Sequence, residues 1–313
     1  MWIIKNRVAF YILSGLLLGL SVLALAIWGV KPGVDFSGGS VLEVNFTENN
    51  PGKTVVVEKI DSLKLDLGDY SVRETGNSGY IVRLKSIDEA EKGQIVGSLE
   101  TLGKMEEKRF NTIGPVLGAE LRNKAIMSFV LVLILITLFI AYAFRHVSKP
   151  VSSWKYGYVA ILTLLHDMLI PIGVFSVMGH FYGVEVDTLF IVAILVILGY
   201  SINDTIIVFD RIRENLSKVR DDERNEKFEE VVGAGLKQTI GRSVNTSFTT
   251  LLSLLAIYFI GGEVTKYFAL ALIIGVIAGA YSSIFFASPM LVSIKNRQDR
   301  KAAELKAELK AGK

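Results

Sequence analysis

The chain has 313 residues, of which 51% are hydrophobic, with a mean hydropathy of +0.44 and a formal net charge of +3. Such a hydropathy is too high for an ordinary soluble protein. The apolar residues also lie in long blocks rather than at regular spacing, which excludes a soluble protein for a second reason. Cysteine is absent, which excludes disulfides and thiolate metal sites. We predict a polytopic α-helical membrane protein, and we expect no metal site, no cofactor and no nucleic-acid partner.

Six apolar blocks are long enough to span a membrane, because a helix needs about 20 apolar residues to cross the hydrocarbon core. The first block follows Lys5 and Arg7 and so resembles a signal peptide. Its apolar run of about 23 residues, however, exceeds the ~7–15 of such a segment, and we interpret it as an uncleaved anchor. The six predicted spans are roughly 8–30, 125–144, 157–178, 188–209, 243–260 and 264–288.

The distribution of charge predicts the topology. Lys and Arg outnumber Asp and Glu before the first span, in 145–155 and in the tail from Lys295. The positive-inside rule places these segments in the cytoplasm, so both termini lie inside and 31–124 lies outside. The predicted division is 1–30 for the N-terminus and first span, 31–124 for an external domain, 125–294 for a five-helix bundle with a cytoplasmic loop at 210–242, and 295–313 for a charged cytoplasmic tail.

The first span is followed by Gly33-Val34-Asp35-Phe36-Ser37-Gly38-Gly39-Ser40. An acid is tolerated at the membrane interface, where an aromatic ring such as Phe36 is an anchor. Gly38 and Gly39 lack β-carbons, so they allow a tight turn and a close backbone approach. We predict a hinge or docking point here, whereas an ordinary linker would explain the glycines alone.

The external region has the pattern of a small α+β domain. The predicted order is a strand at 40–46, a helix over 56–67, strands near 70–74 and 80–84, a helix ending at Gly103 and a strand at 104–113. Ser86-Ile87-Asp88-Glu89 is typical of a capping box before the second helix. The order β-α-β-β-α-β is ferredoxin-like. Because the domain has no catalytic triad, metal spacing or phosphate loop, we interpret it as structural or partner-binding.

Two acids fall inside predicted spans, Asp167 in the third and Asp204 in the fourth. An acid in hydrocarbon costs at least about 2.5–3.5 kcal/mol, so such groups normally face the bundle interior and mark an ion path. Asp167 follows His166, and the two are candidates for a proton relay. We favour the alternative, a buried pair that ties helices together, since adjacent side chains on a helix need not touch each other.

Asp204 has Ser201 on the same helix face, and Arg242 opens the fifth span at a similar depth. A polar stripe continues from Arg242 through Thr246, Thr249 and Ser253. If the two faces meet, Asp204 and Arg242 form a pair whose strength changes when the acid binds a proton, as a proton-coupled switch requires. The alternatives are a snorkelling arginine and a hydrogen-bonded packing group.

Two further patterns concern packing. The sixth span has a small residue at every fourth position, which predicts close helix contact. Segment 226–241 carries apolar residues among charges and is typical of an amphipathic helix on the inner membrane surface. The small residues of the sixth span are Ala271, Gly275, Gly279 and Ser283.

Taken together, these motifs resemble those of the SecF family of the bacterial SecDF protein-export complex, within the resistance-nodulation-division superfamily. The resemblance covers nearly the whole chain in order. The matching motifs are Val34-Asp35-Phe36-Ser37-Gly38-Gly39, Gly114-Pro115-Val116-Leu117-Gly118, Leu165-His166-Asp167, and Gly199-Tyr200-Ser201-Ile202-Asn203-Asp204-Thr205 with its continuation to Asn215.

The resemblance implies a multi-pass protein of the bacterial inner membrane that pairs with SecD beside the SecYEG translocon and helps to export unfolded polypeptides. YidC and YajC are further candidate partners, and membrane lipid surrounds the helices. The family uses proton flow, or sodium flow in some members. Its ion-coupling acid and base correspond to Asp204 and Arg242, with Asp167, His166, Ser201 and Thr246 as secondary candidates for the ion path.

Two other functions have to be weighed. Two membrane aspartates also suit an intramembrane aspartyl protease, in which two carboxylates share a proton. Such proteases have Gly-x-Gly-Asp before the second acid, but this chain has Ser-Ile-Asn-Asp at 201–204. A small-molecule or lipid exporter of the same superfamily normally holds two such halves in one chain. We therefore predict no catalytic residue.

Overall fold

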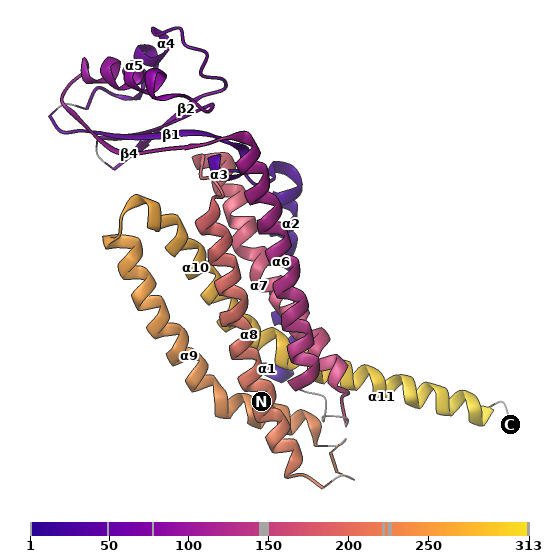
Figure 1. Ribbon diagram of the computed structural model, residues 1–313. Helices are drawn as coiled ribbons and strands as arrows, with labels where there is room; N and C mark the ends of the chain where they lie inside the picture. Colours follow the sequence, from indigo (N-terminus) through magenta and orange to yellow (C-terminus); the bar gives the residue numbers. More distant parts are fainter. Residues whose placement is uncertain are drawn as a thin grey trace. The chain divides into compact units, whose positions relative to one another are not determined.

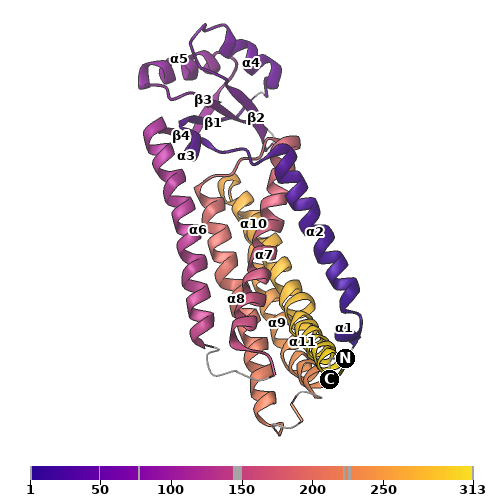
Figure 2. The same ribbon diagram turned by 90° about the vertical axis from the view of Figure 1, so that its right-hand side faces the viewer.

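The computed structural model describes residues 2–48, 50–76, 78–143, 150–220, 223–224 and 227–311. The chain forms two compact units, one of Met1–Gly29, Phe129–Val177 and Val192–Lys313, the other of Val30–Ser128 and Met178–Ile191. Six of the described helices are long and apolar enough to cross a membrane, in agreement with the predicted spans. The chain is therefore a multi-pass membrane protein with a small antiparallel domain (Figures 1 and 2).

The smaller unit contains a four-stranded antiparallel sheet of order β2-β3-β1-β4, which confirms the ferredoxin-like prediction. Alternate residues such as Leu42, Val44 and Val82 are buried beneath two helices that cover one face of the sheet (Figure 2). Its elements are α3 (Val34–Ser37), β1 (Gly39–Phe46), α4 (Lys53–Asp61), β2 (Ser71–Thr75), β3 (Gly79–Leu84), α5 (Glu89–Glu100) and β4 (Met105–Ile113).

The predicted capping box is displaced by two residues. Asp88, not Ser86, is the N-cap of α5: its carboxylate accepts from the amide of Glu91 at 2.8 Å, and Glu91 accepts from the amide of Asp88 at 3.1 Å. Ser86 and Glu89 have the same spacing, but the helix begins at Glu89, so Asp88 occupies the N-cap position. Helix α4 also ends earlier than predicted, because Lys64 adopts a φ of 51° after the last turn.

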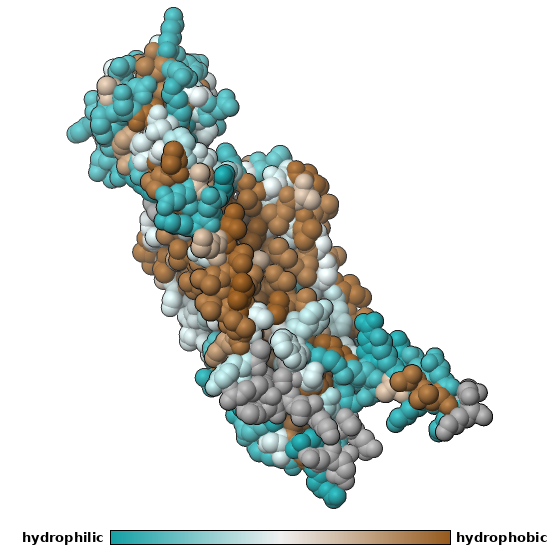
Figure 3. Space-filling view, turned by 45° about the vertical axis from the view of Figure 1, so that its right-hand side comes forward, coloured by the Kyte–Doolittle hydropathy of each residue, from teal (hydrophilic) through white to brown (hydrophobic). Residues whose placement is uncertain are grey.

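The larger unit is a bundle of long helices. The helices are α1 (Trp2–Lys5), α2 (Arg7–Trp28), α6 (Pro115–Ala143), α7 (Ser153–Tyr182), α8 (Thr188–Ser217), α9 (Phe228–Ile260), α10 (Glu263–Ser282) and α11 (Ser288–Ala311), with the π-helix η1 (Ser283–Ala287) between the last two. The first turns of α6, the last of α7 and the first of α8 belong to the smaller unit. Much of the helical surface is apolar, as a lipid-facing surface requires (Figure 3).

The amphipathic segment predicted over 226–241 is not a separate surface helix. From Phe228 onward it is the first part of α9, which continues unbroken through the fifth span. Its apolar residues Phe228, Val232 and Leu236 are buried, in one core with Ile212 on the extended end of α8. The predicted cytoplasmic loop 210–242 is thus mostly helix, because the apolar residues that suggested membrane contact pack against a neighbouring helix instead.

Helix α10 packs closely through its small residues, as predicted. An added β-carbon on Gly279 would lie 3.2 Å from Cβ of Ser201, and one on Gly275 would meet the side chain of Ile197. Ala271 is fully buried on the same face. These residues therefore allow α10 to approach α8 at short distance, as small residues do between membrane helices.

Replacing Gly173 by alanine is expected to destabilise the helix bundle by about 1–3 kcal/mol. A β-carbon there would lie 2.5 Å from Cα of Ser21, so α7 and α2 would have to separate at the backbone. Gly157→Ala is the matched control on α7, since its β-carbon would lie 3.8 Å from a flexible side-chain atom of Ile140. Thermal unfolding of the full chain in detergent should show a lower midpoint for the first variant only; equal midpoints would contradict this packing.

Candidate functional site

A buried polar network lies inside the membrane helices. Asp167 on α7 is fully buried and Asp204 on α8 is 5% exposed; these are the two buried acids among the described residues of the helices. Buried hydroxyl residues lie on α7, on α8, on α9 and on the continuous segment α10–η1–α11. They are Thr163, Ser176, Ser201, Thr205, Thr239, Ser243, Ser247, Ser282, Ser283 and Ser288.

Asp167 connects three helical segments. One carboxylate oxygen accepts two hydrogen bonds. One comes from Ser201 on α8, and the other, at 2.7 Å, from Ser282 at the end of α10. The second oxygen lies 2.8 Å from Nδ1 of His166, so the adjacent side chains do meet. The His166 ring stacks on Phe286 at 5.3 Å between centroids, and its buried Nε2 has no partner in the described part of the chain. Asp167 is therefore held from several sides.

A π-helical turn that the sequence did not predict lies next to this network. Ser283 at its start bonds through its hydroxyl to that of Thr205 at 3.1 Å, and Ser288 donates to the backbone carbonyl of Ser283 at 3.2 Å. A π-turn disturbs the regular backbone bonding of a helix and occurs often at functional sites. Its one signal in the sequence is the group of three serines in an otherwise apolar span.

Asp204 has fewer hydrogen-bond partners than Asp167 among the described residues. Its Oδ1 accepts a hydrogen bond from Ser243 of α9 at 2.9 Å, while Oδ2 is buried and has no partner in the described ranges. Tyr200, one turn earlier on α8, donates to Ser247 of α9 at 3.3 Å. An unsatisfied buried carboxylate oxygen is costly, and a bound proton, cation or water removes that cost.

No ion pair within 4 Å joins Asp204 and Arg242 in this structure, where Arg242 is exposed, and their pairing stays a prediction. Each residue of a helix is rotated by about 100°, so the face that meets α8 carries Ser243 and Ser247, whereas Arg242 and Thr246 lie on the adjoining open side. Ser243 therefore takes the place expected for the arginine. The two carboxylates also bind different hydroxyls, with no hydrogen bond between them in the described chain.

The polar stripe on α9 is real but faces outward. Arg242, Thr246, Thr249 and Ser253 are all exposed, next to the buried face that meets α8. The hydroxyls of Thr249 and Ser253 donate within α9, to the carbonyls of Asn245 at 3.1 Å and of Thr249 at 3.3 Å. A hydrophilic strip of this kind is unfavourable against lipid, so its natural neighbour is another protein or water.

The two glycine motifs pack together within the smaller unit. Gly38 has a φ of 75°, and an added β-carbon there would lie 2.8 Å from Cα of Pro115. A β-carbon on Gly118 would lie 2.8 Å from the amide nitrogen of Gly38. These contacts confirm the close backbone approach, and the segment after Gly33 also forms the short helix α3, which was not predicted.

The other members of the motifs support this junction in different ways. Asp35 accepts a hydrogen bond from the amide of Thr188 at 2.9 Å, and Phe36 is buried. Gly39 has a φ of 131°, and a β-carbon there would lie 2.6 Å from the carbonyl oxygen of Leu84. Gly114 has open space around it. Most of the motif is thus used for packing, and its role as a hinge stays a prediction.

A family model described as protein export membrane protein SecD/SecF, C-terminal, matches residues 94–297. The chain belongs to the SecD/SecF family. It is 40% identical over 310 residues to the protein translocase subunit SecF of Thermobaculum terrenum, covering 94% of both chains. It is 37% identical over 294 residues to the SecF subunit of Synechocystis sp., covering 90% of both.

A solved structure extends the likeness to the fold. The crystal structure of SecDF from Thermus thermophilus, described as a translocon-associated membrane protein, matches with a TM-score of 0.80 and 30% identity. The match covers 94% of this chain and 38% of the SecDF chain. The chain thus has the length of the SecF relatives and spans well under half of the SecDF protein.

Replacing Asp167 by alanine is expected to destabilise the bundle by about 2–4 kcal/mol, because Ser201, Ser282 and His166 lose their shared buried acceptor. The exposed Asp210 on α8 offers the control, Asp210→Ala, which we expect to change stability by less than about 0.5 kcal/mol. Detergent-phase thermal unfolding of both variants measures the difference. A shared midpoint would show that the network contributes nothing to stability.

Proposed function

We propose that this chain is the SecF-type subunit of an ion-driven complex that promotes the late export of secreted polypeptides. The relatives named protein translocase subunit SecF, similar over at least nine-tenths of the chain, support the role in protein translocation. The proposed environment is the bacterial inner membrane, with both termini and the Lys295 tail in the cytoplasm and the ferredoxin-like domain outside.

The single observation that carries ion coupling is the state of Asp204. This carboxyl group is buried in a membrane helix, and one of its oxygens has no partner among the described residues. Such a group is stable when neutral or when a cation is bound, and it becomes costly when that ion leaves. Ion release is therefore coupled to whatever rearrangement gives the carboxylate a new partner.

Arg242 is the proposed new partner. It is one residue away from Ser243, which binds Asp204 in this structure, so a rotation of α9 about its axis exchanges the hydroxyl for the guanidinium. Successive residues lie about 100° apart around a helix axis, so a rotation of about this size brings Arg242 to the place of Ser243. The coupling ion is a proton, with sodium as the alternative, and Asp167, His166, Ser201 and Thr246 remain candidates for its path.

The outward polar stripe on α9 supports a second membrane chain as partner. Arg242, Thr246, Thr249 and Ser253 need a polar surface, and the SecDF relative carries further chain beyond the part that matches here. We propose a separate SecD-type subunit against this stripe. SecYEG, and further YidC and YajC, are the partners that the family resemblance adds, with an unfolded polypeptide as client.

The function is tested with right-side-out membrane vesicles that hold a secreted protein arrested late in translocation. An imposed proton gradient should release this protein when the chain is present, and release should fall several-fold in vesicles from cells depleted of it. Restoring the chain from a plasmid should restore release. Equal release with and without the chain would contradict a role in late export.

A further inference from the structure

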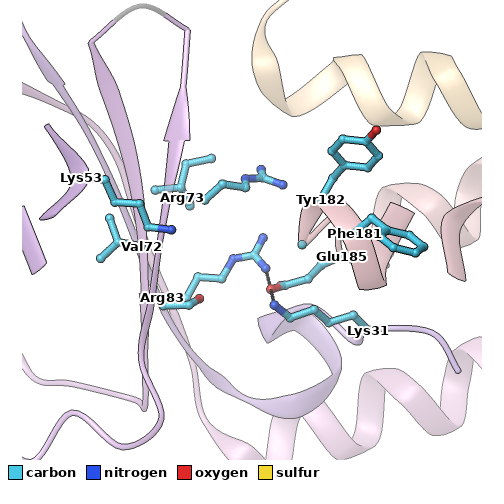
Figure 4. Close-up of a pocket in the computed structure, with 11 residues that line it drawn as sticks. Lys31, Lys53, Val72, Arg73, Arg83, Phe181, Tyr182 and Glu185 are labelled. Carbon is cyan, nitrogen blue, oxygen red and sulfur yellow. Dashed lines mark ion pairs between the residues drawn. The ribbon is translucent and has the colours of Figure 1, made fainter. Parts of the chain in front are cut away.

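A cleft of about 270 Å³ lies within the smaller unit (Figure 4). One wall is the open face of the sheet, opposite the two helices, with Arg73 on β2 and Arg83 on β3. Another wall is the connection that leaves the end of α7. The described lining residues are Lys31, Lys53, Ser71, Val72, Arg73, Ile81, Arg83, Phe181, Tyr182, Gly183 and Glu185.

The charge of the cleft is strongly unbalanced. Four cations, Lys31, Lys53, Arg73 and Arg83, line it, and Glu185 is the one acid among its described lining residues. Lys31 and Arg83 share that single carboxylate, as the dashed lines in Figure 4 show. Lys53, Arg73 and Arg83 all extend from the domain toward the cleft.

The cations affect one another. Burial, together with the neighbouring Arg73, lowers the pKa of Arg83 to about 10, well below that of an ordinary guanidinium. Burial, then Arg83 and Arg73, also lowers the pKa of Lys31. The carboxylates of Asp187 and Asp35 act on Arg83 in the opposite direction, and a bound anion would stabilise the charged forms of Lys31 and Arg83 in the same way.

The cleft is lined in part by residues at the ends of membrane-spanning helices. Phe181 and Tyr182, in the last turn of a membrane-spanning helix, are 63% and 72% exposed, as expected of aromatic residues at a membrane interface. Lys31 follows the end of the first span, and Pro32 pairs with Val186 of the α7–α8 connection. Two spans therefore end beside the same cationic cleft.

We propose that this cleft binds the phosphate of an anionic lipid headgroup in the leaflet next to the ferredoxin-like domain. Guanidinium groups match phosphate in geometry and charge, and basic pockets beside membrane helices bind such headgroups. The volume fits a headgroup, while the acyl chains run past the aromatic end of α7 into the membrane. This lipid site does not depend on the proposed ion coupling or on the proposed role in export.

The test measures retention of dioleoylphosphatidylglycerol by the full chain in native mass spectrometry, with dioleoylphosphatidylcholine as the zwitterionic comparison. The cleft variant is Lys53→Gln with Arg73→Gln, which leaves the Arg83–Glu185 pair intact. The matched variant is Lys104→Gln with Lys108→Gln, two exposed lysines of the same domain outside the cleft. Free glycerol phosphate, inorganic phosphate and an unfolded acidic peptide are titrated in parallel.

We expect selective retention of the anionic lipid, weakened about 25-fold in the cleft variant and unchanged in the matched variant, since each surface cation contributes about a factor of five. Equal retention of the two lipids, or equal loss in both variants, would overturn the proposal. Binding of free phosphate as tight as that of the lipid would assign the cleft to a soluble phosphate compound instead. Cleft-dependent binding of the peptide without lipid would assign it to the exported chain.

Discussion

Replacing Asp204 by asparagine is expected to reduce gradient-driven release of a late export intermediate to the level measured without the chain. Asparagine keeps the size of the side chain and still accepts the hydrogen bond of Ser243, but it cannot lose a proton or bind a cation as a carboxylate does. The complex should therefore assemble normally while the ion-dependent step is lost. Release from membrane vesicles and co-purification of the subunits measure the two properties separately.

Two variants make this prediction specific. Asp210→Asn is the same chemical change on the same helix, at an exposed residue paired with Arg213, and should leave release unchanged. Ser243→Ala removes the hydroxyl donor but keeps the acid, so it should reduce release only in part. Normal release by Asp204→Asn would remove the coupling role from this residue and would leave the chain as a scaffold.

Replacing Gly39 by alanine is expected to destabilise the smaller unit by about 2–4 kcal/mol. The φ of 131° disfavours any L side chain, and the new β-carbon would lie 2.6 Å from the backbone oxygen of Leu84, which cannot move without breaking the β1–β3 pairing. The start of β1 would have to shift away from β3. Limited proteolysis of the full chain in detergent should show faster cleavage within the domain.

Gly114→Ala is the control for this substitution. Gly114 belongs to the second glycine motif, but apart from its two chain neighbours no atom of the described residues lies within 4 Å of the position that its β-carbon would occupy. We expect its rate of proteolysis to match that of the unmodified chain. If Gly39→Ala were cleaved no faster than Gly114→Ala, the close approach at β3 would not limit the stability of the domain.

Hydropathy and alternation were sufficient to predict the architecture. The spans follow from the length of the apolar blocks, and the sheet follows from apolar residues at every second position, such as Val44 between Glu43 and Asn45. The displaced capping box shows the limit of local patterns. Two candidate pairs, Ser86 with Glu89 and Asp88 with Glu91, overlap in the sequence, and only the backbone geometry decides between them.

The polar network was predicted only in part. Asp167 and Asp204 are conspicuous because charge is rare in hydrocarbon, but Ser243 and Ser282 are ordinary residues whose importance comes from contacts across helices. Helix α9 carries polar side chains on two adjoining faces, so periodicity did not show that Ser243 rather than Arg242 meets α8. A π-turn likewise depends on backbone hydrogen bonding, for which a single sequence has no clear pattern.

The account depends on one buried carboxyl group that gains and loses an ion as the export complex works. Difference infrared spectroscopy of the reconstituted complex, recorded as a proton gradient is imposed and then collapsed, observes the stretching band of a protonated carboxyl directly. We predict a reversible change in this band that is absent in Asp204→Asn and retained in Asp210→Asn. A spectrum that does not respond to the gradient, or a response that survives in Asp204→Asn, would contradict the central claim.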